Sequence, residues 1–308
     1  MHCHFFTTRL GAAAILAAVV IASPARAATD TSRIVSIGGA VTEILYVLGH
    51  GKNIVGVDTT SIYPAQAMKE KANVGYMRQL SAEGVFGLNP SVIIAIASAG
   101  PKETINVLEA AKVPLVVIPD SYTEQGIVEK IKLIGDVVGA TERAACLAAR
   151  VHDDIAALDK IRAGIKTPKR ILFMLSFVNG RVMAAGRGTA ADGIIRMAGA
   201  VNVFSEHEAY KQITDEAVIA ARPDVIVTIS RGGPADLSAD TVFAQPALAA
   251  TPAAASKAFV SMDGLYLLGF GPRTARAARD LALTLYPEIK GAAPLPSEQT
   301  NGKGACAE

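Results

Sequence analysis

The sequence predicts an α/β protein of two Rossmann-like α/β lobes joined by one long connecting helix, with a ligand cleft between the lobes. Two observations predict this fold class. Short apolar runs alternate with helical stretches in both halves of the chain, as in parallel sheets that are covered by helices. Between the halves, residues 125–165 show helical periodicity and no strand pattern.

The first 27 residues have the layout of a secretory signal peptide. Arg9 supplies the basic start, residues 10–22 form an apolar run, and Ser-Pro-Ala-Arg-Ala ends the segment with a small-x-small cleavage pattern. A membrane anchor is the alternative, and Pro24 argues against it because it interrupts an apolar run already short for a bilayer. We therefore expect export, with cleavage near Ala27.

The charge of the mature chain excludes one class of function. The leader contains Arg9 and Arg26 and no acidic residue, so its removal reduces the 30 Lys and Arg to the number of Asp and Glu, which is 28. Nucleic-acid binding needs a basic face, so we expect no nucleic-acid partner. No later apolar run is long enough to span a bilayer, so the mature protein is not expected to be embedded in the membrane. We also expect it to be a monomer.

The N-terminal lobe is expected over residues 33–124. Apolar runs predict buried strands, and the stretches between them predict helices, the first of which ends at Gly49. The predicted strands are 33–37, 92–96 and 114–118, and the predicted helices are 41–48 and 104–111.

The interlobe helix is expected over residues 125–165. Ile127, Ile131 and Ile134 recur at helical spacing, and after Gly139 the apolar face continues over residues 142–161. We therefore expect a single helix between the lobes.

The C-terminal lobe is expected over residues 169–290, with the same alternation of strands and helices. The predicted strands are 170–174, 225–229 and 258–260, and the predicted helices are 191–198, 215–221 and 273–285. Residues 291–308 are rich in Gly, Pro, Ser and polar residues, so we expect a disordered tail. The sequence leaves open whether Cys146 and Cys306 pair, although a helical position and a polar tail argue against a disulfide.

A short repeat supports the division into two lobes. Ser81-Ala82-Glu83 and Thr214-Asp215-Glu216 each begin a helical stretch, and in both copies a Pro follows the Glu by seven residues and precedes a buried strand. Ser81 and Thr214 have the character of helix N-caps, with the Glu in the first turn.

These features resemble the helical-backbone, class III substrate-binding proteins of ABC importers, which capture haem, ferric siderophores or cobalamin. Residues 74–83, Val-Gly-Tyr-Met-Arg-Gln-Leu-Ser-Ala-Glu, resemble the periplasmic haem-binding proteins in particular, as do residues 184–192 and 267–273. The resemblance covers residues 33–289. It implies a periplasmic protein without catalytic activity, which carries haem b as its transported ligand to an inner-membrane ABC permease dimer with its ATPase.

The resemblance also implies the residues of the haem site. Tyr76 is the expected axial ligand of the haem iron, because a phenolate oxygen suits ferric iron. A free Tyr has a pKa near ~10, so a cation is needed beside it, and Arg78 or Arg231 can supply one. Arg187, Arg231 and Arg273 are candidates to bind the propionates, since guanidinium pairs well with carboxylate. The sequence does not decide whether His207 is a second axial ligand.

Glu83 and Glu216 have a different expected role. In the family, one surface Glu of each lobe pairs with Arg residues of the permease dimer, and the repeat places these two residues at equivalent positions. The alternative is stabilisation of a helix N-terminus, which is worth roughly 0.3–1 kcal/mol.

Two other functions remain open at this point. A ferric-siderophore or cobalamin receptor would have the same fold. An exported NAD-dependent oxidoreductase is the alternative from a different class, because Gly186-x-Gly188-x-x-Ala191 followed by Glu206 matches a dinucleotide fingerprint in form. Its position in the middle of an exported chain disfavours that interpretation.

Overall fold

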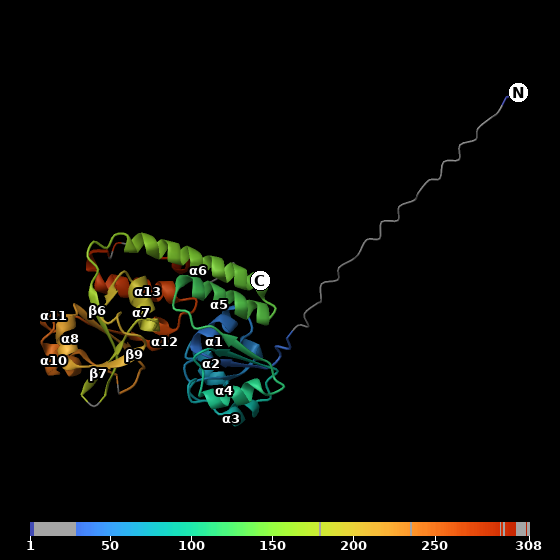
Figure 1. Ribbon diagram of the computed structural model, residues 1–308, viewed down its shortest axis with the longest axis horizontal. Coiled ribbons are helices and arrows are strands. Elements are labelled where there is room, and N and C mark those ends of the chain that lie inside the picture. The colour runs from blue at the N-terminus through green and yellow to red at the C-terminus, as the bar shows by residue number, and fades with distance from the viewer. Residues whose placement is uncertain are drawn as a thin grey trace.

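Two α/β lobes lie side by side and are linked along one edge by helices (Figure 1). The computed structural model describes residues 1–2, 29–178, 180–234, 236–289, 291, 293–299 and 306. The expected signal peptide therefore lies outside the described residues, apart from its first two. Within the described part of the chain, no helix has the length and apolar character needed to cross a membrane.

The N-terminal lobe is a parallel sheet of five strands in the order β3-β2-β1-β4-β5. The central strands β1 and β4 are rich in β-branched residues and buried throughout, as expected for a sheet covered on both faces. The strands are β1 (Ile34–Ile37), β2 (Ile54–Val57), β3 (Ala72–Asn73), β4 (Val92–Ile96) and β5 (Leu115–Ile118). The helices are α1 (Gly39–Val47), α2 (Ala65–Glu70), α3 (Ala82–Phe86) and α4 (Lys102–Glu109), with a 3-10 turn, η1, at Gly51–Asn53.

The C-terminal lobe contains a mixed sheet in the order β11-β10-β6-β7-β9, with β8 paired to β6. The sequence predicted three of these strands and missed β7, β8 and β9. The antiparallel β6–β7 hairpin turns at Gly180, which has a φ of +75°. The strands are β6 (Arg170–Val178), β7 (Arg181–Ala185), β8 (Val201–Asn202), β9 (Tyr210–Ile213), β10 (Val225–Ser230) and β11 (Phe259–Asp263).

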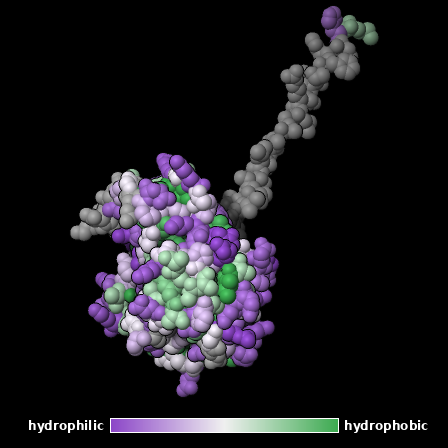
Figure 2. Space-filling view, turned by 90° about the vertical axis from the view of Figure 1, so that its left-hand side faces the viewer, coloured by the Kyte–Doolittle hydropathy of each residue, from purple (hydrophilic) through white to green (hydrophobic). Residues whose placement is uncertain are grey.

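The helices of this lobe include several short ones at its outer end. They are α7 (Ala190–Met197), α8 (Asp215–Ala221), α9 (Ala239–Phe243), α10 (Pro246–Ala249), α11 (Pro252–Ala255), α12 (Gly264–Leu268) and α13 (Thr274–Leu285), with the 3-10 turn η2 at Pro287–Ile289. Figure 2 faces this outer end and shows an apolar area surrounded by hydrophilic side chains. Ile219 of α8 is 45% exposed, and Ala249 of α10 and Ala255 of α11 are also exposed. Small methyl groups expose little apolar surface, so this end of the lobe is only weakly hydrophobic.

The connection between the lobes is a pair of helices, so the expectation of one helix over 125–165 is wrong. The chain forms α5 (Glu124–Val137), turns at Gly139 with a φ of +69°, and returns as α6 (Thr141–Arg162). Glycine permits this conformation, which side-chain-bearing residues adopt with strain. Only α6 is the long connecting helix. Arg143, near the start of α6, donates to the Leu48 carbonyl of the N-terminal lobe at 3.2 Å. Helix α6 also packs against α13 of the C-terminal lobe.

Residues 293–299 of the C-terminal tail pack on the protein, which differs from the expectation of disorder for this part of the tail. Leu295 is fully buried, and α14 (Pro296–Gln299) packs on α6. Glu298 pairs with Arg276 at 3.1 Å and with Arg279 at 3.5 Å. The tail ends in a disulfide between Cys146 and Cys306, so the sequence argument against that pair is also wrong. Leu295, the Glu298 ion pairs and the disulfide thus hold the described part of this segment on the protein.

The lobes also contact one another through a buried ion pair. Arg273, at the start of α13, donates two hydrogen bonds of 2.9 Å to the Glu43 carboxylate of α1. Glu43 is only 4% exposed, and burial raises its pKa although Arg273 opposes that shift. The Arg273 guanidinium also lies 3.6 Å from the centre of the Tyr63 ring. Beside this pair, the Lys130 ammonium of α5 donates to the Phe270 carbonyl at 3.1 Å, and burial lowers the pKa of Lys130 to about 8.

Replacing Glu43 by Ala is expected to destabilise the protein by about 3 kcal/mol, because the partly buried Arg273 guanidinium would lose its carboxylate partner. The melting temperature should fall by about 6 °C in a chain of this size, measured by circular dichroism. Glu109→Ala is the control, since Glu109 is exposed at the end of α4. Equal melting temperatures for the two variants would show that the ion pair contributes nothing to holding the lobes together.

Candidate ligand cleft between the lobes

A cavity of about 640 Å³ lies between the two lobes. The N-terminal lobe lines it with the loops that follow β1 to β5, at the carboxyl ends of the parallel strands, where α/β folds place their ligands. The C-terminal lobe lines it mainly with the ends of β6, β9 and β10 and with α12. The volume falls within the range of pockets that enclose a small molecule.

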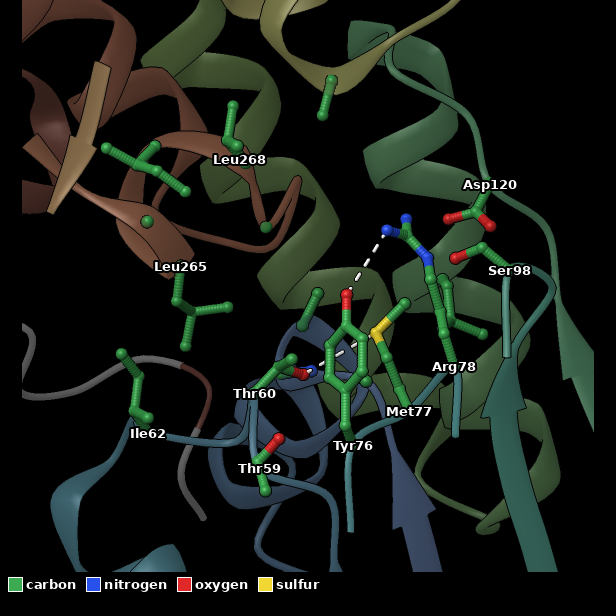
Figure 3. A pocket seen from close by; sticks show the side chains of 18 of the residues that line it. Thr59, Thr60, Ile62, Tyr76, Met77, Arg78, Ser98, Asp120, Leu265 and Leu268 are labelled. Atoms are coloured by element: carbon green, nitrogen blue, oxygen red, sulfur yellow. Dashed lines mark hydrogen bonds between the residues drawn. The ribbon is translucent and has the colours of Figure 1, made fainter. Parts of the chain in front are cut away.

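The two walls of the cavity differ in chemistry. The C-terminal lobe contributes mostly aliphatic side chains, with Tyr210, Ser230 and Arg231 as its polar groups. The N-terminal lobe contributes Tyr76 and Arg78 together with hydroxyl, carboxylate and thioether groups (Figure 3). The aliphatic residues are Leu175, Ile229, Leu265 and Leu268, and the other N-terminal-lobe groups include Thr59, Thr60, Met77, Ser98, Asp120 and Tyr122.

Tyr76 lies on the loop between β3 and α3. Gly75 has a φ of +93°, and its N–H donates to Asn73 Oδ1 at 2.8 Å, which turns the chain toward the cavity. The Gln79 N–H donates to the Tyr76 carbonyl at 2.7 Å, and the Gly100 N–H donates to the carbonyl of Met77 at 2.8 Å. The backbone is therefore held on both sides of Tyr76.

The Tyr76 phenol is accessible from the cavity and has a cation beside it. The side chain is 39% exposed, and Arg78 Nη1 donates to its hydroxyl oxygen at 3.4 Å. Figure 3 shows the Tyr76 hydroxyl directed toward the Arg78 guanidinium. Arg78 was one of two cations that the sequence proposed for this position, and the geometry brings it to the phenol.

Two further tyrosines line the cavity and differ from Tyr76 in their surroundings. Burial, followed by the nearby carboxylate of Asp120, raises the pKa of Tyr122 to about 12, and burial also raises the pKa of Tyr210. Both phenols therefore keep their protons at neutral pH and can act as hydrogen-bond donors. Sequence reasoning missed them, together with Asp120 and Ser98. Ser98, Asp120 and Tyr122 could have been found from their place just after predicted strands, where loop residues of a parallel sheet converge. Tyr210 carried no such signal, because it begins β9, which was not predicted.

The four candidate arginines divide into two pairs. Arg78 and Arg231 line the cavity, whereas Arg187 and Arg273 do not. Arg187 forms an ion pair of 2.7 Å with Glu208, and this pairing lowers the pKa of Glu208. Arg273 is the interlobe partner of Glu43.

His207 is also placed away from the cavity lining. Its ring stacks on that of Phe204, with 6.0 Å between the ring centres, and its carbonyl accepts a hydrogen bond from the Arg187 N–H at 2.7 Å. These contacts hold His207 against Phe204 and Arg187.

Glu83 and Glu216 lie in the first turns of α3 and α8, one in each lobe, and both are exposed. The Ser81 hydroxyl accepts from the Gly84 N–H at 3.4 Å, and the Thr214 hydroxyl accepts from the Ala217 N–H at 3.3 Å. Both predicted N-caps are confirmed. The pKa of Glu216 is lowered by hydrogen bonds from its own backbone N–H and from the Thr214 side chain.

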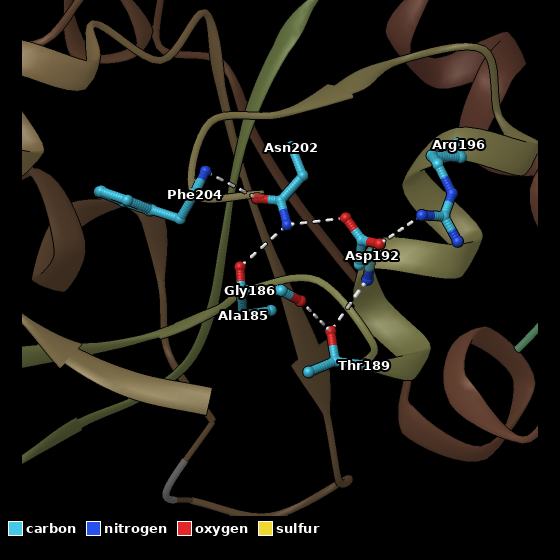
Figure 4. Close-up of polar contacts among 7 residues, drawn as sticks. All are labelled: Ala185, Gly186, Thr189, Asp192, Arg196, Asn202 and Phe204. Atoms are coloured by element: carbon cyan, nitrogen blue, oxygen red, sulfur yellow. Dashed lines mark hydrogen bonds and ion pairs between the residues drawn. The ribbon is translucent and has the colours of Figure 1, made fainter. Parts of the chain in front are cut away.

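The glycine motif at 186–191 serves packing in this fold (Figure 4). A Cβ on Gly186 would clash with the His207 carbonyl. The Thr189 hydroxyl accepts from the Asp192 N–H at 3.1 Å and donates to the Gly186 carbonyl at 2.8 Å, which closes the N-terminus of α7. Asp192 is buried against Asn202 at 3.0 Å and against Arg196 at 2.7 Å. Close backbone packing at Gly186 and the Thr189 cap of α7 therefore account for this motif without a bound nucleotide.

Two lobes with a ligand cleft between them and one long linking helix define a class III substrate-binding protein. The family model described as periplasmic binding protein matches residues 34–265, and the chain belongs to this family. It is the substrate-binding component of an ABC importer and not an enzyme.

Solved structures of haem-binding proteins are similar to this chain. The apo form of the periplasmic haem-binding protein RhuT from Roseiflexus sp. RS-1 is 38% identical, with a TM-score of 0.79, over 84% of this chain and 99% of that one. A periplasmic haem-binding protein from Pseudomonas aeruginosa is 32% identical, with a TM-score of 0.77, over 86% of this chain and 95% of that one.

A curated relative points to a different ligand. The vitamin B12-binding protein of Pectobacterium atrosepticum is 25% identical over 242 residues, which are 77% of this chain and 84% of that protein. An uncharacterised ABC transporter substrate-binding lipoprotein of Bacillus subtilis is 25% identical over 262 residues, which are 84% of this chain and 81% of that protein. The similar proteins thus share the class of substrate-binding protein but differ in the ligand that their names give.

Proposed function

We propose that this protein binds ferric haem b in the interlobe cleft and delivers it to an inner-membrane ABC permease dimer with its ATPase. One observation carries the proposal: an accessible phenol, Tyr76, faces the cavity with the Arg78 guanidinium 3.4 Å from its oxygen. Similarity to solved haem-binding proteins supports it.

The proposed iron ligand is the Tyr76 oxygen. A phenolate is a hard anionic donor and a known axial ligand of ferric haem. A guanidinium beside the oxygen stabilises the negative charge that the phenolate carries. Arg78 supplies that cation from a position two residues along the same loop.

The remaining walls suit the rest of a haem molecule. The apolar macrocycle would lie against Leu175, Leu265 and Leu268 of the C-terminal lobe. Arg231, the other cavity arginine, is proposed to meet a propionate, while Arg78 stays beside the Tyr76 oxygen. Arg187 and Arg273 are not included, because each already pairs with a carboxylate of the protein.

Delivery is proposed to depend on Glu83 and Glu216. Each lobe presents one of these exposed carboxylates at the start of a helix, as docking on a two-fold permease would require. Export to the periplasm as a monomer, with cleavage near Ala27, is proposed from the leader sequence. The Cys146–Cys306 disulfide supports export, since such bonds persist in oxidising compartments.

Cobalamin is the second candidate ligand, because the chain is similar to a curated vitamin B12-binding protein. Equilibrium dialysis of the mature protein against ferric haem, cyanocobalamin and a ferric siderophore separates the alternatives. We expect retention of haem, and retention of neither other ligand at the same concentration. Retention of cyanocobalamin or siderophore without haem would overturn the haem proposal while leaving the class of protein intact.

A further inference from the structure

The loop after β10 brings the second cavity cation, Arg231, to the cleft. Arg231 lines the cavity and is exposed, and within the described part of the chain no ion pair restrains its guanidinium. Arg78, in contrast, donates to the Tyr76 oxygen. The direction in which Arg231 leaves the backbone therefore depends on the conformation of its loop.

A single carboxylate organises that loop. Asp236 Oδ1 accepts from the Arg231 N–H at 2.8 Å, and its Oδ2 accepts from the Gly232 N–H at 3.0 Å and from the Ser230 hydroxyl at 2.5 Å. The Ser230 oxygen also accepts from the Gly232 N–H at 3.2 Å, and the Asp236 N–H donates back to the Gly233 carbonyl at 3.1 Å. These bonds close a ring around the segment that carries Arg231.

The chemistry of this ring requires a carboxylate. Three donors from consecutive residues converge on its two oxygens, whereas the side chain of Asn would turn an NH₂ group toward one of them. Hydrogen bonds from Ser230 and from the Arg231 backbone lower the pKa of Asp236, so the acceptor is ionised at neutral pH. Gly232 adopts a φ of +73°, which completes the turn.

We propose that Asp236 is a positioning residue for ligand binding, which orients Arg231 toward the cleft by holding the Ser230–Gly232 backbone. This inference rests on the proposed haem-binding function. Asp236 does not line the cavity, so it acts through Arg231 and not by contact with the ligand.

The N-terminal lobe contains a similar arrangement that shows why Asp236 is the one to test. Asp58 accepts from the Gly38 N–H at 2.8 Å, from the Thr60 N–H at 2.9 Å and from the Ser61 hydroxyl at 2.9 Å, and so shapes another loop of the cleft. Asp58 is fully buried within that network, so its replacement would perturb the whole lobe. Asp236 is only partly buried and is absent from the hydrophobic core, so we expect its replacement to perturb the fold less.

The test is a double-mutant cycle on ferric haem binding with Asp236→Ala and Arg231→Ala. Each single variant is expected to bind haem about tenfold more weakly, the size of a lost charge-assisted hydrogen bond. The double variant should bind no more weakly than Arg231→Ala alone, because Asp236 acts through that residue. The haem absorption spectrum should shift in the same direction in both single variants. Asp236→Asn, which retains one acceptor oxygen, should fall between wild type and Asp236→Ala.

Three results would overturn the positioning role. They are additive losses in the double variant, wild-type affinity in Asp236→Ala, and wild-type affinity in Arg231→Ala. Melting temperatures of all variants establish that they are folded, and Asp236→Asn provides the comparison if Asp236→Ala does not fold. Failure of the wild-type protein to bind haem would instead refute the proposed function, so the two failures are distinguishable.

Discussion

Replacing Tyr76 by Phe is expected to lower the affinity for ferric haem by about a hundredfold, which corresponds to about 2.8 kcal/mol. The ring and its packing remain, and only the oxygen that is proposed to bind the iron is lost. The absorption spectrum of the haem that still binds should change, because the ligand field of the iron changes. Titration of wild type and variant with haem, followed by absorption, measures both effects.

Tyr63→Phe is the matched control for this experiment. Tyr63 is 44% exposed, close to the 39% of Tyr76, and its ring packs on Arg273 outside the cavity lining. The control should bind haem with wild-type affinity and spectrum. If Tyr76→Phe does the same, the iron ligand lies elsewhere, and His207 is the next residue to replace.

The Glu83→Ala/Glu216→Ala double variant is expected to bind haem normally and to lose more than about nine-tenths of transport. Both carboxylates are exposed and lie outside the cavity lining, so their proposed partners are basic groups of the permease. Uptake of haem by proteoliposomes that contain the permease and ATPase measures delivery. The residual transport should decrease further at high salt, which screens the remaining charge attraction.

Glu103→Ala is the control for the docking variant. Glu103 is an exposed acid in the first turn of α4, so it shares the helix position but has no proposed partner. The control should transport haem at the wild-type rate. Normal transport by the double Glu variant would refute docking and leave stabilisation of the helix N-termini as the role of both residues.

Continuous apolar runs predicted several of the buried strands, although β2, which is also largely buried, was missed. The run at 92–96 became β4, and the run at 225–229 lies in β10, because continuous burial leaves a continuous apolar pattern. β9 was missed because two of its four residues are exposed and it lacks such a run. The break at Gly139 was hidden because the apolar spacing continues on both sides of it, although the helix direction reverses.

The candidate site was predicted in part for a similar reason. Tyr76 and Arg78 are neighbours in sequence, so a local motif could bring both into one prediction. Arg273 and Glu43 are 230 positions apart in the sequence, so no local sequence pattern predicts that they pair. The Cys146–Cys306 disulfide, at a separation of 160 residues, escaped prediction in the same way. Tertiary contacts decide which arginines remain available to a ligand.

The bond between the Tyr76 oxygen and the haem iron is tested most directly by resonance Raman spectroscopy of the protein loaded with ferric haem. Wild-type protein should show vibrations of a tyrosinate bound to iron, and these should shift when the protein is made with ring-deuterated tyrosine. The same bands should vanish in Tyr76→Phe and persist in Tyr63→Phe. Absence of tyrosinate bands from the wild-type complex, or their persistence in Tyr76→Phe, would contradict ligation of haem by Tyr76.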